Sequence, residues 1–217
     1  MSYTDIVYEE REQIAYIAIN RPEVMNAFRG QTVEEMIQAM TKAGWDKNIA
    51  AIVLTGTGDR AFCTGGDQSA HSGQYDGRGT AGLPIEELHS AIRDVPKPVI
   101  ARVQGYAIGG GNVLATLCDM TIASEKAVFG QVGPKVGSVD PGWGTAYLAH
   151  VVGEKKAREI WYMCRRYNAQ EALAMGLCNV VVPNDQLDAE VTKWGRELVE
   201  KSPTAIAIAK RSFNAST

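Results

Sequence analysis

Two glycine-rich segments carry the strongest chemical signal in the sequence. The first is FCTGGD at residues 62–67, and the second is GYAIGGGN at residues 105–112. Each follows an apolar stretch typical of a buried strand, and the second leads into a predicted helix. Glycine lets the backbone come close to a ligand, and the first N–H groups of a helix have no partner within that helix. Two such groups directed at one point would form an oxyanion hole, which stabilises negative charge on a carbonyl oxygen.

An acidic residue on a third glycine-bearing segment is the candidate acid–base group. Asp140 lies in the segment GSVDPG at residues 137–142, two positions after Ser138. Burial raises the pKa of a carboxyl group and thereby suits it to proton transfer near neutral pH. The alternative is structural, because Asp is also a favoured N-cap for a following helix. From the residues alone, the cap is the preferred interpretation.

Other catalytic and cofactor motifs give weaker signals. The spacing Gly105-x-x-x-Gly109 differs from the dinucleotide-binding fingerprint G-x-G-x-x-G, and the sequence has no P-loop pattern. His71, His89 and His150 show no triad or zinc-protease spacing, so we expect structural or solvent-exposed roles for them. The cysteines form no C-x-x-C pair, which favours reduced packing residues. We therefore expect neither a metal nor a redox cofactor.

The composition limits the class of protein. The chain has 217 residues, of which 45% are hydrophobic and 22% charged, and its net charge is −3. Such a chain can bury one substantial core, and its charge is unlike that of a nucleic-acid-binding protein. The longest uncharged run, at residues 103–118, is too short and too rich in glycine to span a bilayer. The first residues lack the apolar segment of a signal peptide. We predict a soluble, cytoplasmic protein of a single domain.

Strand and helix patterns alternate along the chain and must position the glycine segments. Apolar runs predict strands at residues 14–19, 50–54, 99–103, 120–123 and 127–131. Helices are predicted at 86–94 and 112–117. Another is predicted to follow a capping box formed by Thr32 and Glu35. Beyond residue 140 the pattern is repeatedly helical, and Asn168 and Glu171 form a second capping box there. A long loop is expected at 67–82. This order predicts an α/β fold with mostly parallel strands, a core at about 1–185 and C-terminal helices at about 186–217.

Several motifs together resemble the crotonase superfamily, which is also called the enoyl-CoA hydratase/isomerase superfamily. They are RPE with the following NA at residues 21–27, AFCTGGD, PKPVIARVQGYAIGGGNVLA and FGQVGPKVGSVDPGWGT. The resemblance covers nearly the whole chain and implies a spiral of ββα units and an acyl-CoA substrate. It also implies a homotrimer or a hexamer built from two trimers. The N–H groups of Gly66 and Gly110 are then expected to hold the thioester carbonyl and to stabilise an enolate.

Departures from the superfamily's sequence pattern limit which reactions this protein is expected to catalyse. Hydratases carry glutamates at the positions of Val113 and Gly133, so hydration of an enoyl-CoA would lack its acid and its base here. With the resemblance, Asp140 becomes the preferred catalytic group, because it is similar to the catalytic Asp of the naphthoate synthase branch. Ser138 is similar to a motif serine of that branch and would bond a substrate oxygen. Gly133 is similar to a site where some of these synthases bind bicarbonate as a base, and bicarbonate binding here is left open.

The resemblance also indicates where the rest of the substrate lies. Arg29 matches a place where relatives contact the CoA phosphates, and its alternative is a solvated charge before a helix. CoA is expected over Arg29 and residues 65–70, which include Gly65, Asp67 and Gln68. Tyr75, in the long loop, is a weaker candidate for a contact with the acyl group.

Two reactions of this branch fit the sequence. One is ring-opening hydrolysis of 2-ketocyclohexane-1-carboxyl-CoA to pimeloyl-CoA, in anaerobic benzoate degradation. The other is ring closure to 1,4-dihydroxy-2-naphthoyl-CoA. The stretch from Gln74 to Ala115 and the triplet VDP at 139–141 look more like the ring-opening hydrolase, whereas Trp143-Gly144 looks like some synthases. We predict the hydrolase. The synthase, a general hydratase/isomerase and a non-catalytic acyl-CoA-binding protein remain alternatives.

The C-terminal end of the sequence bears on this comparison. Members of the superfamily usually continue past this point through helices that cover an active site, and in the naphthoate synthase branch that tail supplies a tyrosine. We expect such a tail to be missing here, and no catalytic tyrosine is assigned.

Overall fold

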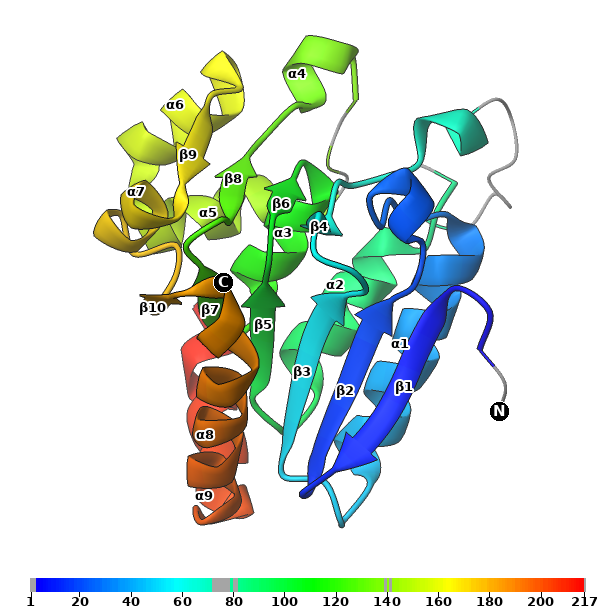
Figure 1. Cartoon of the computed structure of the whole chain (residues 1–217), viewed down its shortest axis with the longest axis vertical. Coiled ribbons are helices and arrows are strands. Elements are labelled where there is room, and N and C mark those ends of the chain that lie inside the picture. The colour runs from blue at the N-terminus through cyan, green and yellow to red at the C-terminus, as the bar shows by residue number, and fades with distance from the viewer. Residues whose placement is uncertain (1–2, 72–78, 80–81, 139, 141, 217) are drawn as a thin grey trace.

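The strands of this protein form two sheets in the computed structural model, which describes residues 3–71, 79, 82–138, 140 and 142–216 (Figure 1). The larger sheet contains, in spatial order, β1 (Ile6–Arg11), β2 (Ile14–Ile19), β3 (Ala51–Gly56), β5 (Val99–Val103), β7 (Met120–Ser124) and β10 (Val180–Val182). The smaller sheet contains β4 (Ala61–Cys63), β6 (Tyr106–Ile108), β8 (Val128–Gly130) and β9 (Arg166–Asn168). Only the β1–β2 and β8–β9 pairs among these strands are antiparallel. The predicted α/β fold with mostly parallel strands is confirmed.

Helices connect and cover these strands. The α-helices are α1 (Gly30–Trp45), α2 (Ile85–Asp94), α3 (Gly110–Leu117), α4 (Gly133–Val136), α5 (Gly144–Val152), α6 (Glu154–Met163), α7 (Ala169–Ala174), α8 (Leu187–Val199) and α9 (Pro203–Asn214). Short 3-10 helices are η1 (Pro22–Val24), η2 (Gln68–His71) and η3 (Asn184–Gln186). The predicted helices at 86–94 and 112–117 are therefore present, and the second begins earlier, at Gly110.

A unit of two strands and a helix repeats along the chain. In β3–β4–α2, β5–β6–α3 and β7–β8–α4, the first strand joins the larger sheet and the second joins the smaller one. Because β4, β6 and β8 pair in parallel, their carboxyl ends lie at one edge (Figure 1). This is the spiral of ββα units that the resemblance implies, and it brings three separate connecting segments together.

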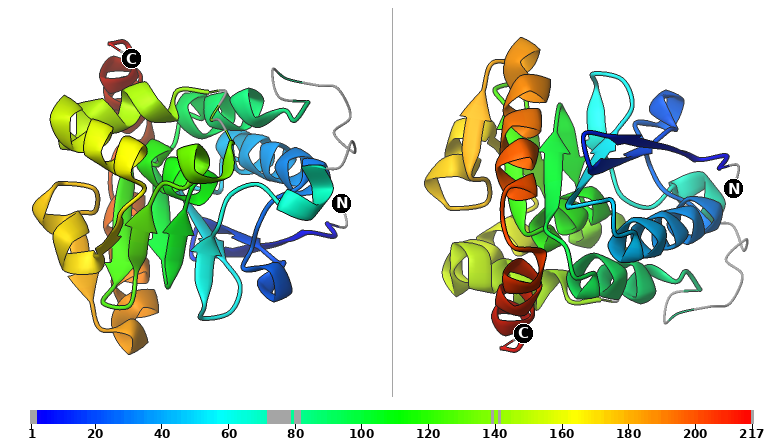
Figure 2. Two further views of the ribbon diagram at one scale, coloured as in Figure 1. Left: turned by 90° about the horizontal axis from the view of Figure 1, so that it is seen from above. Right: turned by 90° about the horizontal axis from the view of Figure 1, so that it is seen from below.

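The central strands of the larger sheet, β2, β3, β5 and β7, are buried on both faces, which explains their nearly continuous apolar sequences. On β2, Ala15, Ile17 and Ile19 face the main core with α1, α2 and α3. Ile14 and Tyr16 alternate with them and face the opposite side, where they pack with Leu187 and Val191 of α8. The views in Figure 2 show α8 on the other side of this sheet from α1 and α2. The apolar face of α8 is thus part of the core.

The start of α1 differs from the prediction. The sequence favours Thr32 as the N-cap with Glu35 as its partner, but the helix begins at Gly30. The Glu35 carboxylate instead accepts hydrogen bonds from the N–H groups of Thr4 (2.8 Å) and Asp5 (2.7 Å). The predicted capping box is therefore wrong, because the Glu35 carboxylate bonds the backbone before β1 and not the start of α1. The second predicted box is confirmed, since Asn168 Oδ1 accepts from the N–H of Glu171 at 2.9 Å.

A buried lysine fastens the last helix. Lys210 Nζ donates to the carbonyls of Ile92 (2.8 Å) and Lys97 (2.9 Å) and to Asp119 Oδ2 (2.7 Å). Helix α9 is therefore hydrogen-bonded to the C-terminal part of α2 and to the segment just before β5. Across the described residues, every helix is too short or too polar to cross a bilayer.

Candidate active site

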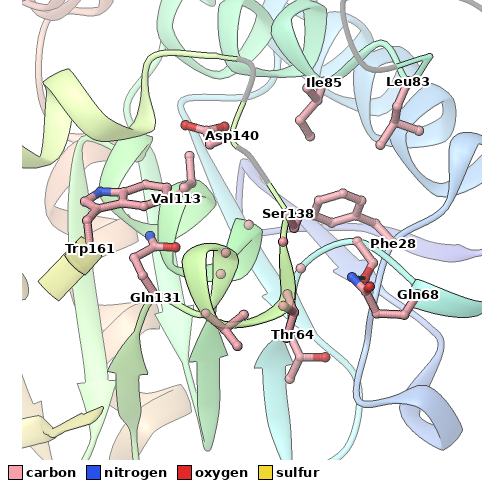
Figure 3. A pocket seen from close by; sticks show the side chains of 18 of the residues that line it. Phe28, Thr64, Gln68, Leu83, Ile85, Val113, Gln131, Ser138, Asp140 and Trp161 are labelled. Atoms are coloured by element: carbon pink, nitrogen blue, oxygen red, sulfur yellow. Dashed lines mark hydrogen bonds between the residues drawn. The ribbon is translucent and has the colours of Figure 1, made fainter. Parts of the chain in front are cut away.

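A cavity of about 260 Å³ opens at the carboxyl ends of the small sheet (Figure 3). Three of its walls come from the segments that follow β4, β6 and β8, and a fourth comes from the start of α2. Ligands bind at this end of parallel strands because the chain leaves the sheet there and its backbone groups are available. Phe28, Leu83, Ile85 and Val113 make one part of the cavity apolar.

The amide of Gly66 is presented by a single parallel bridge to Phe28. The N–H of Phe28 donates to the carbonyl of Gly65, and the N–H of Asp67 donates to the carbonyl of Phe28, both at 2.8 Å. In such a bridge the N–H of the intervening residue points away from the partner chain. The Gly66 N–H accordingly has no acceptor among the described residues, and Gly66 lines the cavity.

The amide of Gly110 is the first of helix α3, so no carbonyl of that helix can accept from it. Gly110 lines the same cavity as Gly66. The two segments touch through glycines, since a methyl group added to Gly65 would lie 2.9 Å from Gly110 N. Gly65 also has φ +90°, which an L side chain rarely adopts. The arrangement can offer two backbone donors to one ligand oxygen at a positive helix end.

Asp140 supplies a carboxyl group to the cavity (Figure 3). Its Oδ1 is 3.4 Å from the N–H of Gly142, before α5, whereas Oδ2 is buried and has no hydrogen-bond partner among the described residues. Burial raises the pKa of Asp140, although the N–H groups of Gly142 and Gly144 oppose this. The N-cap of α5 is Trp143 and no side chain caps it, so the interpretation of Asp140 as the N-cap is wrong. The second carboxyl oxygen remains available for chemistry.

The remaining predicted residues divide into two groups. Gly65, Gln68, Gly133 and Ser138 line the cavity. Arg29 and Asp67 do not belong to its lining, and Tyr75 lies outside the described residues.

Arg29 and Asp67 take part in ion pairs beside the cavity. Arg29 donates to both carboxylate oxygens of Asp5, at 2.7 and 2.8 Å, and 45% of its side chain stays exposed. Asp67 pairs with Arg21 at 2.9 Å. Burial favours a higher pKa for Asp67, but hydrogen bonds from Ser69 and Arg21 outweigh it and lower the pKa. Asp67 therefore fixes the loop that follows Gly66.

Sequence reasoning missed several side chains of the cavity, and among these His89, Gln131 and Trp161 carry a polar group. His89 is 1% exposed, so the expected solvent-exposed alternative is wrong for this residue. Burial lowers its pKa to about 4, against a smaller opposite effect of Glu86. The signal was available, because His89 shares an apolar helix face with Ile85 and Ile92.

Cys63 lies next to the first glycine segment without facing the cavity. It is fully buried, and burial raises the pKa of its thiol to about 12. This agrees with its interpretation as a packing residue. Among the described residues, no three His, Cys, Asp or Glu side chains gather into a group that could hold a metal ion.

Comparison with known proteins identifies the family. The enoyl-CoA hydratase/isomerase family matches residues 9–217. The chain belongs to this family. An enoyl-CoA hydratase/isomerase from Xanthobacter autotrophicus Py2 is similar, with 33% identity and a TM-score of 0.90 over 99% of this chain and 80% of that one. An enoyl-CoA hydratase from Bacillus anthracis has 28% identity and a TM-score of 0.92, over 98% of this chain and 83% of that one.

A third similar structure carries a different name. Pseudomonas aeruginosa DspI has 28% identity to this chain and a TM-score of 0.91, over 100% of this chain and 83% of that one. Together with the family match, these structures confirm the crotonase fold and an acyl-CoA enzyme of the enoyl-CoA hydratase/isomerase type.

Proposed function

We propose that this family member hydrolyses a carbon–carbon bond, opening the ring of 2-ketocyclohexane-1-carboxyl-CoA to give pimeloyl-CoA. The observation that carries the proposal is the half-buried Asp140, whose buried Oδ2 has no partner among the described residues, in the same cavity as the free amides of Gly66 and Gly110. The amides suit a thioester oxygen, and the carboxyl suits proton transfer to and from water.

The proposed reaction has three steps. Asp140 removes a proton from water as the water oxygen bonds to the ring ketone carbon. The bond between that carbon and the α-carbon of the thioester then breaks, and its electron pair forms an enolate whose oxygen accepts from Gly66 and Gly110. Protonation of the α-carbon from Asp140 releases pimeloyl-CoA. Removing one oxyanion-hole donor costs about 3–4 kcal/mol of transition-state stabilisation in comparable enzymes.

The side chains near the amides support this reaction over simple hydration. Val113 and Gly133 line the cavity at the two positions where the hydratases of the superfamily carry glutamates, and neither residue can transfer a proton. Among the described residues that line the cavity, Asp140 is the carboxylic acid. The half-exposed Arg29 remains the proposed contact for the CoA phosphates. Bicarbonate near Gly133 and a trimeric or hexameric assembly are further proposals from the same resemblance.

Ring closure to 1,4-dihydroxy-2-naphthoyl-CoA is the second candidate, favoured by the Trp143-Gly144 pair at the start of α5. It would use the same oxyanion donors and Asp140, with a carbon nucleophile in place of water.

Product analysis separates the candidates. The purified protein is incubated with 2-ketocyclohexanecarboxyl-CoA and, separately, with o-succinylbenzoyl-CoA and crotonyl-CoA, and the products are identified by mass spectrometry. Pimeloyl-CoA from the first substrate, with turnover by Asp140→Asn slowed about 1,000-fold, supports the proposal. Naphthoyl-CoA from the second substrate or hydration of the third, without pimeloyl-CoA, would replace it. Binding without turnover of any of them indicates an acyl-CoA-binding protein.

A further inference from the structure

His89 is the feature of the cavity that the proposed reaction does not yet use. The imidazole is buried, and its Nδ1 atom has no hydrogen-bond partner among the described residues. Asp140 Oδ2 is also buried without a hydrogen-bond partner among the described residues, and Asp140 borders the same cavity. A buried polar atom without a partner costs free energy, so two of them on one cavity call for an explanation by ligand or water.

The two atoms lie against the same short turn. A methyl group added to Gly142 would collide with His89 Nδ1, and one added to Gly144 would collide with Asp140 Oδ2. Trp143, between these glycines, has its ring centroid 6.3 Å from that of His89. The turn at residues 142–144 therefore lies against both atoms. A side chain at position 142 or 144 would collide with one of them.

The chemical states of the two groups are complementary to one water molecule. Burial lowers the pKa of His89 to about 4, so the imidazole is neutral at neutral pH and one ring nitrogen carries a lone pair. A carboxylate oxygen is also an acceptor. A water molecule has two O–H donors, and donating both leaves an oxygen lone pair free to attack a carbonyl carbon.

We propose that His89 Nδ1 and Asp140 Oδ2 together hold the water that attacks the ring ketone. This inference rests on the proposed function. The water donates one O–H to each atom, and the O–H bond toward Asp140 breaks as the new C–O bond forms. The proton passes to Asp140 and then to the α-carbon after the C–C bond breaks. His89 stays neutral throughout and orients the nucleophile, with the proton on its Nε2 atom.

Kinetics of matched variants test this role. His89→Phe keeps a ring of similar size without an acceptor, and His89→Asn restores a polar amide close to Nδ1. With 2-ketocyclohexanecarboxyl-CoA we expect kcat to fall about 100-fold in His89→Phe, the loss typical of a reacting group misplaced by about 1 Å, with KM little changed. His89→Asn should recover much of this loss. His150→Phe, at an exposed histidine of α5, is the control and should match the wild type.

A double-variant cycle separates this role from a structural one. Because both residues hold the same water, His89→Phe combined with Asp140→Asn should be no slower than the slower single variant. Losses that multiply would overturn the inference, as would full activity of His89→Phe.

Two measurements on the wild type do not depend on turnover. A crystal structure should show a water within about 3.2 Å of both His89 Nδ1 and Asp140 Oδ2, and nitrogen-15 NMR should find Nδ1 unprotonated at pH 7. Lack of that water, or a proton on Nδ1, overturns the inference even if pimeloyl-CoA forms. A wild type that shows both features without forming pimeloyl-CoA overturns the proposed function and leaves the water site supported.

Discussion

The buried imidazole of His89 should make folding stability depend on pH. In the unfolded chain His89 takes up a proton near its ordinary pKa of about 6.5, whereas in the folded protein burial lowers the pKa to about 4. Between these values the unfolded state binds more protons, so stability falls as the pH falls. At 1.36 kcal/mol for each tenfold change in proton affinity, lowering the pH from 7.5 to 4.5 costs about 2.5 kcal/mol through this group.

Urea unfolding at the two pH values measures the effect. Carboxyl groups also titrate in this window, so the quantity of interest is the difference between the wild type and His89→Asn, which lacks the titration. The pH-dependent loss should be about 2.5 kcal/mol smaller in the variant. The exposed His150→Asn serves as the control and should behave like the wild type. Equal pH dependence in wild type and His89→Asn would refute the reasoning that burial keeps this imidazole neutral.

Three other predictions concern the site and its scaffold. Gly110→Ala places a methyl group 2.7 Å from Phe28 Cζ, so we expect at least a 100-fold loss of kcat by steady-state kinetics, while Gly30→Ala, with room for its methyl, should keep activity. Asp140→Asn should slow turnover about 1,000-fold without lowering the urea midpoint at pH 7, because it removes a half-buried charge; in the wild type, activity should fall on acidification through the raised pKa of Asp140. Lys210→Met should cost about 3 kcal/mol in thermal or urea unfolding, since Asp119 and two carbonyls lose their partner, unlike Lys193→Met on the exposed side of α8.

The central strands β2, β3, β5 and β7 of the larger sheet could be predicted because burial on both faces requires apolar, β-branched runs. The more exposed edge strands β1 and β10 were not predicted. The predicted strands at 14–19 and 99–103 have the bounds of β2 and β5. The strands β4, β6 and β8 have three residues each, which is too short for periodicity to indicate a separate sheet. The prediction extended the strand around β8 to Gln131, but the strand ends at Gly130, and Gln131 therefore lies in the cavity.

The candidate site was only partly visible in the sequence for a related reason. Glycine segments identify backbone that comes close to a ligand, and the resemblance then singled out Gly66 and Gly110 within them. Side chains that reach the cavity from helices give no local signal, because their spacing is that of core residues. His89 on α2 and Trp161 on α6 both occupy positions on an apolar helix face. Which of these core positions borders a cavity depends on how distant helices pack.

The origin of the cavity walls has an evolutionary consequence. The segments after β4 and β6 contribute main-chain amides, which no substitution other than proline deletes, whereas the segment after β8 and helices α2, α3 and α6 contribute side chains. Mutation can thus exchange the groups at positions 89, 113, 133 and 140 while the amides proposed to bind the thioester persist. Point substitutions at these positions can therefore give a related protein a new reaction while it keeps the proposed binding site for the acyl carbonyl.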